Sequence, residues 1–307
     1  MATPVKVATV GMFDGVHRGH LALLSRVSDE ARKRDGRAWV FTFAAHPLTL
    51  IAPDKVPSPL MTVADKVEAL KATGIDGVEV LDFDEDLRRL TAEEFLTMLR
   101  DRYGVGVLVM GFNHRFGSDR VVELSHYREI GRRLGMEIIR ADELRDDEIA
   151  ATICSSSLRE AIAEGDVKAA GDMLGRPYAL HGNVVAGKQL GRKIGFPTAN
   201  VSLTEPGMLT PLKGVYAVDV TLPGGEKRRA MLNIGVRPTV DDSDRPEVTI
   251  EAHIIDWSGD LYGQPLTIEF ISRLRDELRF DNLDSLKRQL EKDKALAMGE
   301  GCGVSGI

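Results

Sequence analysis

The sequence has few of the features that would place the chain outside the cell, in a membrane or on a nucleic acid. Only two of its 307 residues are cysteines, Cys154 and Cys302, and they are not spaced as a metal-binding pair, so we expect reduced thiols. No stretch approaches the roughly 18 to 20 apolar residues of a membrane span, and the N-terminus has no signal-peptide pattern. The formal net charge of −7 argues against the basic face that nucleic-acid binding needs. We therefore expect a cytoplasmic protein with neither nucleic-acid nor membrane partners.

Length and periodicity indicate two domains, the first of them an α/β domain. A chain of 307 residues is long for a single hydrophobic core. Its first half alternates strand-like runs with helical patterns, which predicts a parallel sheet buried on both faces. A capping box, Thr91-Ala92-Glu93-Glu94, opens one helix and residues 63–72 form another. The strand candidates are residues 5–10, 38–43, 78–81, 107–110 and 137–140.

The second half changes to short strands without helices between them. This pattern predicts an antiparallel barrel or sandwich, closed by one helix over residues 283–296. Ser157 and Asp166 are expected to cap two short helices that precede it. The strand candidates are residues 179–185, 215–222, 230–234, 248–255 and 266–270. With a boundary at Arg176-Pro177, the expected domains are residues 1–176 and 177–298, followed by a glycine-rich tail, 299–307, that we expect to be disordered.

A candidate phosphate site follows the first strand, in the run Gly11-Met12-Phe13-Asp14-Gly15-Val16-His17-Arg18-Gly19-His20. The free N–H groups and the positive dipole end of a helix favour a phosphate at such a strand-to-helix junction. Gly19 lets the backbone approach a triphosphate closely, and His17 and His20 can donate hydrogen bonds to phosphoryl oxygens as charge builds. The alternative for each histidine is a surface or core residue. Because two histidines flank one glycine, we favour the functional interpretation.

A second candidate segment is Ile153-Cys154-Ser155-Ser156-Ser157-Leu158-Arg159, at the start of a late helix. Its serines offer hydroxyl and backbone donors, and its arginine offers a charged fork; the alternative is that the serines only cap the helix. Together with H-x-G-H, this segment resembles the nucleotidylyltransferase superfamily, whose members attack the α-phosphate of a nucleoside triphosphate directly. The resemblance implies phosphate-binding roles for Gly11, Phe13, Asp14, Gly19, Ser155, Ser156 and Arg159.

Two further segments narrow this resemblance. Thr42-Phe43-Ala44-Ala45-His46-Pro47 and Gly111-Phe112-Asn113-His114-Arg115-Phe116-Gly117 resemble segments of the bacterial bifunctional riboflavin kinase/FAD synthetases. By this resemblance Asn113 contacts the adenylylation substrates and His46 lies near FMN, while core packing is an equally good explanation for the phenylalanines. The sequence departs from the usual residues of the family at Ala44, Ala45, His114 and Cys154. An enzyme with the kinase activity alone therefore remains an alternative.

The most informative stretch spans residues 182–200, where glycines and basic residues precede Phe196-Pro197-Thr198-Ala199-Asn200. This is the composition of a loop that wraps phosphate, although its spacing is not that of a Walker A loop. The run closely resembles the G-F-P-T-A-N signature of riboflavin kinases. The phosphate-binding candidates in the loop are Gly187, Lys188, Gly191, Arg192 and Gly195.

The chemistry of the signature suggests a magnesium site and a base. Thr198 and Asn200 can supply hydroxyl and carbonyl oxygens, which are hard ligands suited to Mg²⁺ beside ATP phosphates. Glu251 shares one face of an alternating strand with Thr249 and His253. The resemblance makes Glu251 the base that takes the proton of the ribityl 5′-hydroxyl; without it, a solvated strand residue would be the better interpretation.

The resemblance extends over residues 5–296. It also implies roles for two residues near the C-terminal helix. Arg275 and Phe280 are implied to lie on the flavin side; the alternative is an ion pair beside a helix and a core aromatic. The resemblance implies ATP-dependent conversion of riboflavin to FMN and then of FMN to FAD, with one site per domain, small-molecule substrates and Mg²⁺. A flavin-binding or regulatory protein without turnover is the alternative from another class, and it would leave the candidate catalytic side chains unused.

Overall fold

The structure is a computed structural model in which packing divides the chain into two compact units, one ending at Ser155 and the other starting at Ser156. It describes residues 4–111, 114–120, 123–141, 153–187, 190–237 and 247–299. Asn113, Lys188 and the tail beyond residue 299 lie outside the described residues.

The first unit is built on a five-stranded parallel sheet in the order β3-β2-β1-β4-β5. Because β1 lies in the middle and the chain continues on its other side with β4, the strand order reverses between β1 and β4. In open α/β sheets, ligands bind at the carboxyl ends of the strands beside this reversal. The strands are β1 (Lys6–Val10), β2 (Arg37–Phe43), β3 (Gly77–Leu81), β4 (Val105–Met110) and β5 (Glu137–Arg140).

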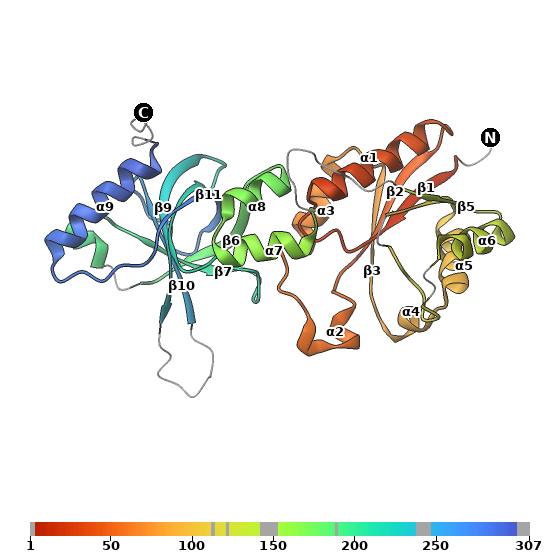
Figure 1. Ribbon diagram of the computed structural model, residues 1–307. Coiled ribbons are helices and arrows are strands. Elements are labelled where there is room, and N and C mark those ends of the chain that lie inside the picture. Colours follow the sequence, from red (N-terminus) through yellow and green to blue (C-terminus); the bar gives the residue numbers. More distant parts are fainter. Residues whose placement is uncertain are drawn as a thin grey trace, which may run out of the picture. The chain divides into compact units, whose positions relative to one another are not determined.

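Helices cover both faces of this sheet, as the sequence predicts (Figure 1). One hydrophobic cluster joins the sheet to α1 and α3, and a second joins its other face to α5 and α6. The helices of the unit are α1 (Arg18–Arg32), α2 (Leu48–Ile51), η1 (Pro53–Lys55), α3 (Val63–Ala72), α4 (Glu85–Arg89), α5 (Ala92–Tyr103) and α6 (Leu124–Leu134).

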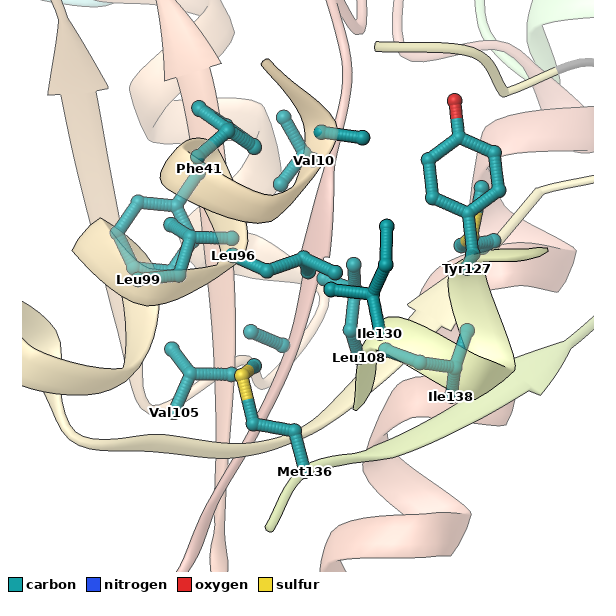
Figure 2. Packing of buried hydrophobic residues seen from close by; sticks show 14 of the residues in the cluster. Val10, Phe41, Leu96, Leu99, Val105, Leu108, Tyr127, Ile130, Met136 and Ile138 are labelled. Atoms are coloured by element: carbon teal, nitrogen blue, oxygen red, sulfur yellow. The ribbon is translucent and has the colours of Figure 1, made fainter. Parts of the chain in front are cut away.

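The second cluster also fixes the segment that follows β4. Figure 2 shows Leu96 and Leu99 of α5 and Ile130 of α6 packed around Leu108 of β4. Tyr127 is buried in the same cluster, and its hydroxyl accepts the amide of Phe116 at 3.1 Å while donating to the Phe116 carbonyl at 2.8 Å. Two hydrogen bonds from one buried hydroxyl therefore tie the loop after β4 to the core, at the edge of the sheet where ligands bind.

The second unit contains a closed antiparallel barrel in the order β10-β7-β6-β11-β8-β9, which confirms a barrel rather than a sandwich. Its strands are β6 (Tyr178–Val185), β7 (Ala199–Leu203), β8 (Gly214–Thr221), β9 (Lys227–Arg237), β10 (Glu247–Ile254) and β11 (Pro265–Arg275). Its helices are α7 (Ser155–Glu164), α8 (Val167–Leu174), η2 (Leu190–Ile194) and α9 (Leu283–Ala297).

The caps expected from the sequence are partly confirmed. Thr91 and Glu94 form the reciprocal bonds of a capping box, and Asp166 caps α8. The cap expected at Ser157 is wrong, because α7 already begins at Ser155 and Ser157 lies inside its first turn. The sequence also missed β7, a five-residue strand that directly follows the Phe196-Pro197-Thr198 turn.

The helices α7 and α8 make contacts with the second unit, which contains the barrel. α8 packs against β11 and β6, and the amide of Leu212 donates to the carbonyl of Ile162 in α7 at 3.3 Å. The chain passes from the first unit to the second between Ser155 and Ser156, whereas the boundary expected from the sequence is at residue 176. The two helices α7 and α8 account for the difference.

Candidate active sites

The loop between β1 and α1 lies at the carboxyl end of the central strand, and its backbone is strained. Phe13 and Val16 have φ angles of +49° and +42°, in the left-handed region that side chains with a Cβ rarely adopt. Such conformations cost of order 1–3 kcal/mol each and persist where the surrounding structure holds them. Both side chains are buried in the core beneath the loop, so the packing of Phe13 and Val16 holds the loop in this shape.

The loop brings the two candidate histidines together. Nδ1 of His17 accepts the backbone N–H of His20 at 3.3 Å, which makes His17 the N-cap of α1. The two imidazole rings stack with centroids 3.6 Å apart, and the edge of Phe13 meets His20 at 5.1 Å. Since Nδ1 of His17 is an acceptor, the proton of its neutral ring is on Nε2. The cap made by the His17 side chain and the stacking of the two rings thus bring the pair together.

The electrostatics of the site keep His20 neutral. Burial, followed by the nearby His17, His114 and Lys66, holds the pKa of His20 well below its usual value. Burial likewise lowers the pKa of His114 to about 4. Nδ1 of His20 is buried without a hydrogen-bond partner among the described residues. A neutral imidazole can donate one hydrogen bond to a phosphoryl oxygen without bringing a charge into the resting site.

The serine segment lies against this loop, as the paired motifs predict. A Cβ atom on Gly19 would lie 3.1 Å from the carbonyl oxygen of Ile153, so glycine permits the close approach of the two backbones. Ser155 Oγ donates to the carbonyl of Asp14 at 3.0 Å. Ile153 and Ser155 therefore lie against the loop that carries Asp14 and Gly19, whereas Ser156 and Arg159 belong to the second unit.

Asp14 and Lys66 form a buried polar pair behind the loop. The Asp14 carboxylate accepts the amide of Leu60 at 3.1 Å, so it anchors a neighbouring segment. Lys66 of α3 is 5% exposed, and its ammonium donates to the carbonyl of Phe43, the last residue of β2, at 2.7 Å. Burial lowers the pKa of Lys66, and the charge of Asp14 opposes this. The position of Lys66 beside the loop was not predicted from the sequence, because a lysine within an amphipathic helix gives no signal that its ammonium turns inward.

A cavity of about 530 Å³ opens beside the loop at the carboxyl edge of the sheet. Gly11, directly after β1, and Phe43, at the end of β2, line it, as do His114 and Phe116 of the loop after β4. His46 is not among its lining residues; His46 Nδ1 accepts the amide of Leu48 at 3.1 Å, and the adjacent Pro47 reaches the cavity. Phe43 and Phe116 pack with the core cluster and also line the cavity, and Phe112 lies outside the described residues.

The second candidate site lies across β7, β10 and β9 of the barrel. Glu251 of β10 lies opposite Asn200 of β7 on one side and opposite Asn233 of β9 on the other. Residues that face each other across an antiparallel pair project to the same side of the sheet. Thr198 is exposed, and its hydroxyl donates to Glu251 Oε2 at 3.4 Å. Buried Ile250 and Ala252 alternate with Glu251, so the polar row lies on the outer face of the barrel.

The glycine-rich loop before Phe196 lies beside the polar residues around Glu251. A Cβ atom on Gly187 would collide with the Asn200 amide, so the loop passes directly over that side chain. Gly191 accepts the amide of Phe196 at 2.9 Å, and Gly195 has a φ of +86° that favours glycine. Arg192 is exposed and lines a cavity of about 310 Å³ together with Thr198. The other side of this cavity is formed by Trp257, Gly259, Asp260 and Tyr262.

Of the two residues expected near the flavin, Arg275 bonds to α9 and Phe280 lies beside Arg275. Arg275 donates to the buried Asp293 carboxylate at 2.7 and 3.0 Å, and Asp293 is 0% exposed. The Arg275 guanidinium lies 6.0 Å from the centroid of the Phe280 ring. Gln289 also donates to Asp293, at 2.8 Å. Arg275 thus forms an ion pair with a buried carboxylate. An ion pair beside a helix is the alternative to a flavin-side role that the sequence leaves open for this residue.

Together, these features define a class of protein. The first unit has a histidine pair at its first strand-to-helix junction. The barrel has a threonine, two asparagines and a glutamate on one outer face. Both arrangements are typical of nucleotide-dependent transferases. Two family models match the chain: FAD synthetase over residues 2–157 and riboflavin kinase over residues 174–299. The chain belongs to the family of bifunctional riboflavin kinase/FMN adenylyltransferases.

Similar proteins share this two-part organisation. The bifunctional riboflavin kinase/FMN adenylyltransferase of Escherichia coli (strain K12) is 38% identical over 292 residues, which cover 95% of this chain and 91% of that protein. The protein of the same description from Bacillus subtilis (strain 168) is 32% identical, with 95% and 91% covered. A crystal structure from Streptococcus pneumoniae, described as a macrolide-efflux protein, is 33% identical with a TM-score of 0.86 over 97% of this chain and 95% of that one.

None of the helices in the described part of the chain is both long and apolar enough to cross a bilayer. Among the same residues, no three histidine, cysteine or acidic side chains gather as metal ligands.

Proposed function

We propose that the two activities of the family are divided between the two units, with FMN adenylylation at the His17–His20 loop and riboflavin phosphorylation at Glu251. The observation that carries this division is that each unit has its own cluster of groups suited to phosphate chemistry. The stacked histidines lie at the N-terminus of α1, and the hydroxyl of Thr198 bonds to Glu251 on the barrel.

In the first unit, a phosphate oxygen of FMN attacks the α-phosphate of ATP and pyrophosphate leaves. His17 and His20 donate hydrogen bonds from their neutral rings to the phosphoryl oxygens, where negative charge increases in the transition state. The N-terminal amides of α1 add their dipole to the same stabilisation. The isoalloxazine ring occupies the cavity of about 530 Å³, against Phe43 and Phe116. Asn113, His46 and Arg159 keep the roles that the family resemblance implies.

In the second unit, Glu251 takes the proton of the ribityl 5′-hydroxyl, whose oxygen attacks the γ-phosphate of ATP so that ADP leaves. The ATP phosphates lie along the loop that includes Gly187, Gly191 and Arg192. The cavity beside Thr198, about 310 Å³ in volume, receives the rest of the nucleotide. Because Glu251 faces outward on a rigid strand, its carboxylate is accessible to a substrate hydroxyl.

The residues around Glu251 fit a magnesium ion. Mg²⁺ prefers hard oxygen ligands and keeps several waters while it bridges phosphates. The Thr198 hydroxyl and the Asn200 carbonyl oxygen supply such ligands beside a carboxylate, and Gly187 leaves room above the amide. When bound, the ion neutralises phosphate charge. Thr198 and Asn200 would hold it, and Glu251 would remain the base.

Two coarser proposals accompany the sites. The first is that the adenylyltransferase domain comprises residues 1–176 and the kinase domain residues 177–298, although α7 and α8 pack with the barrel. The second is that the protein works in the cytoplasm.

The proposal is tested by incubating the purified protein with riboflavin, ATP and Mg²⁺ and separating the flavins by chromatography. Formation of both FMN and FAD is expected. FMN alone would restrict the activity to the barrel, and unchanged riboflavin would leave a flavin-binding protein without turnover. Omitting Mg²⁺ in the presence of a chelator should abolish both products.

A further inference from the structure

His253 is a half-buried side chain of β10 that the proposed kinase mechanism does not use. It lies two residues after Glu251, on the same face of the strand. Its Nδ1 lies 2.8 Å from the carbonyl oxygen of Pro197. Since a carbonyl oxygen can only accept, Nδ1 is the donor and carries a proton.

The imidazole of His253 connects the core to the turn that carries Thr198. On one side its ring contacts Phe196, with centroids 5.0 Å apart, and Phe196 is buried in a hydrophobic cluster of the barrel. On the other side it bonds to Pro197. The register pairs Ala252 with Ala199, so the peptide between Pro197 and Thr198 lies just beyond the start of the β7–β10 ladder.

This peptide lies outside the β7–β10 ladder, and the Thr198 hydroxyl has a long bond of 3.4 Å to Glu251. Pro197 has no N–H to donate, and β7 begins only at Ala199. The Thr198 side chain is exposed, so packing does not hold its hydroxyl in place. The bond from His253 to Pro197 therefore sets the plane of the peptide from which Thr198 projects toward Glu251.

We propose that His253 is a positioning residue of the kinase site: its hydrogen bond to the Pro197 carbonyl and its packing on Phe196 fix the Thr198 hydroxyl for the metal-bound phosphates of ATP. The inference rests on the proposed function. Burial lowers the pKa of His253 and the bond to Pro197 opposes this. A neutral ring with its proton on Nδ1 satisfies the carbonyl without adding a charge beside the metal site.

Two substitutions separate the hydrogen bond from the bulk of the ring. H253N keeps an amide N–H near the place of Nδ1, whereas H253L keeps an apolar side chain and removes the donor. H181L is the matched control, since His181 on β6 makes a comparable bond to Thr267 at 3.0 Å, and its carbonyl accepts the amide of Thr204 beyond the far end of β7.

The first measurement is the dissociation constant of ADP by calorimetry, with Mg²⁺ and with a chelator. Loss of one neutral hydrogen bond changes an equilibrium by a factor of up to about ten. H253L is therefore expected to weaken ADP binding by about tenfold with Mg²⁺ and by less than about twofold without it. H253N and H181L should remain within about twofold of the wild type in both conditions.

Kinetics give the second readout. H253L should raise the KM for ATP by about tenfold in the kinase reaction, while the KM for riboflavin and the rate of FMN adenylylation stay unchanged. The inference is overturned if H253L binds ADP with Mg²⁺ like the wild type, or if H253N is as impaired as H253L. If the wild type makes no FMN from riboflavin, the proposed function itself fails, which is a distinguishable result.

Discussion

At the scale of single residues, His17 and His20 differ in how the fold holds them. His17 is fixed by its cap to α1, whereas His20 is held by stacking and by the edge of Phe13. A substitution of His20 therefore removes a donor to phosphate while it leaves the helix start intact. The sequence predicts both residues as candidates, because strand, glycine and helix signals place them at a strand-to-helix junction. The sequence does not show that the His17 side chain caps α1 by accepting the amide of His20.

Replacing His20 should damage only the adenylylation. H20A is expected to lower the rate of FAD formation from FMN by about two orders of magnitude, the usual cost of losing one donor to a developing oxyanion. Conversion of riboflavin to FMN should stay within about twofold. The control is H126A, which changes an exposed histidine of α6. An equal loss in H126A would show that the effect is not specific to the site.

The lowered pKa of the half-buried His114 should make the first unit sensitive to acid. Its pKa is about 4 in the folded chain against 6.5 ordinarily, so between these pH values the unfolded chain binds more protons. The free energy of unfolding should therefore fall as the pH drops from about 6.5 to about 4, by up to about 3 kcal/mol from this residue.

Urea unfolding at pH 7 and pH 4.5 measures this loss in the wild type and in H114F. The variant places an aromatic residue that cannot titrate at this position and should lose less stability between the two pH values. His20 also has a lowered pKa and changes in the same direction, so part of the pH dependence should remain. Identical losses in the two proteins would contradict the burial of His114.

Sequence reasoning found the residues with strong local signals and missed those that depend on tertiary contacts. Glu251 and Thr198 lie within recognisable motifs, and the structure places them 3.4 Å apart. Asn233 and Lys66 are adjacent to their sites only because β9 pairs with β10 and because α3 crosses the end of β2. No spacing along the chain encodes either contact.

At the scale of elements, α9 is fastened to the barrel by the Arg275–Asp293 pair. Removing one partner of a buried ion pair leaves an uncompensated charge and costs about 3–5 kcal/mol, whereas replacing both by apolar residues is often neutral. R275M should therefore destabilise the second unit by about this amount, and R275M/D293L should recover most of it. Thermal or urea unfolding measures both.

The same double variant decides the flavin assignment of Arg275. If the residue only anchors α9, the recovered protein should bind riboflavin with a KM within about threefold of the wild type. A much larger KM in a stable double variant would show that Arg275 contacts the flavin as well. Failure of the double variant to regain stability would contradict the account of the ion pair.

The elements themselves were largely predictable. The helix over residues 63–72 and the strands of the parallel sheet follow from clear apolar periodicity, and their observed bounds agree within two residues. The strand β7 was missed because its five residues include polar Asn200 and Ser202 beside the signature turn. It is a strand because β6 and β10 pair with it on both sides, which is information from the closed barrel and not from its own sequence.

At the scale of the whole molecule, the central claim is that the two units perform successive reactions at chemically separate sites. Each unit has its own core and its own cavity lined by candidate residues. A loss of one site should therefore leave the other working. The closed barrel and the parallel sheet could both be expected from the sequence, while the grouping of α7 and α8 with the barrel depends on contacts that only the folded chain shows.

The most direct test uses two full-length variants, E251Q and H20A, each supplied with riboflavin, ATP and Mg²⁺. E251Q should leave riboflavin unchanged yet convert added FMN to FAD, and H20A should stop at FMN. Mixing the two folded variants should restore FAD formation from riboflavin, because FMN made by one protein is a substrate for the other. Loss of both reactions in either single variant, with its fold intact, would contradict the assignment of one reaction to each unit.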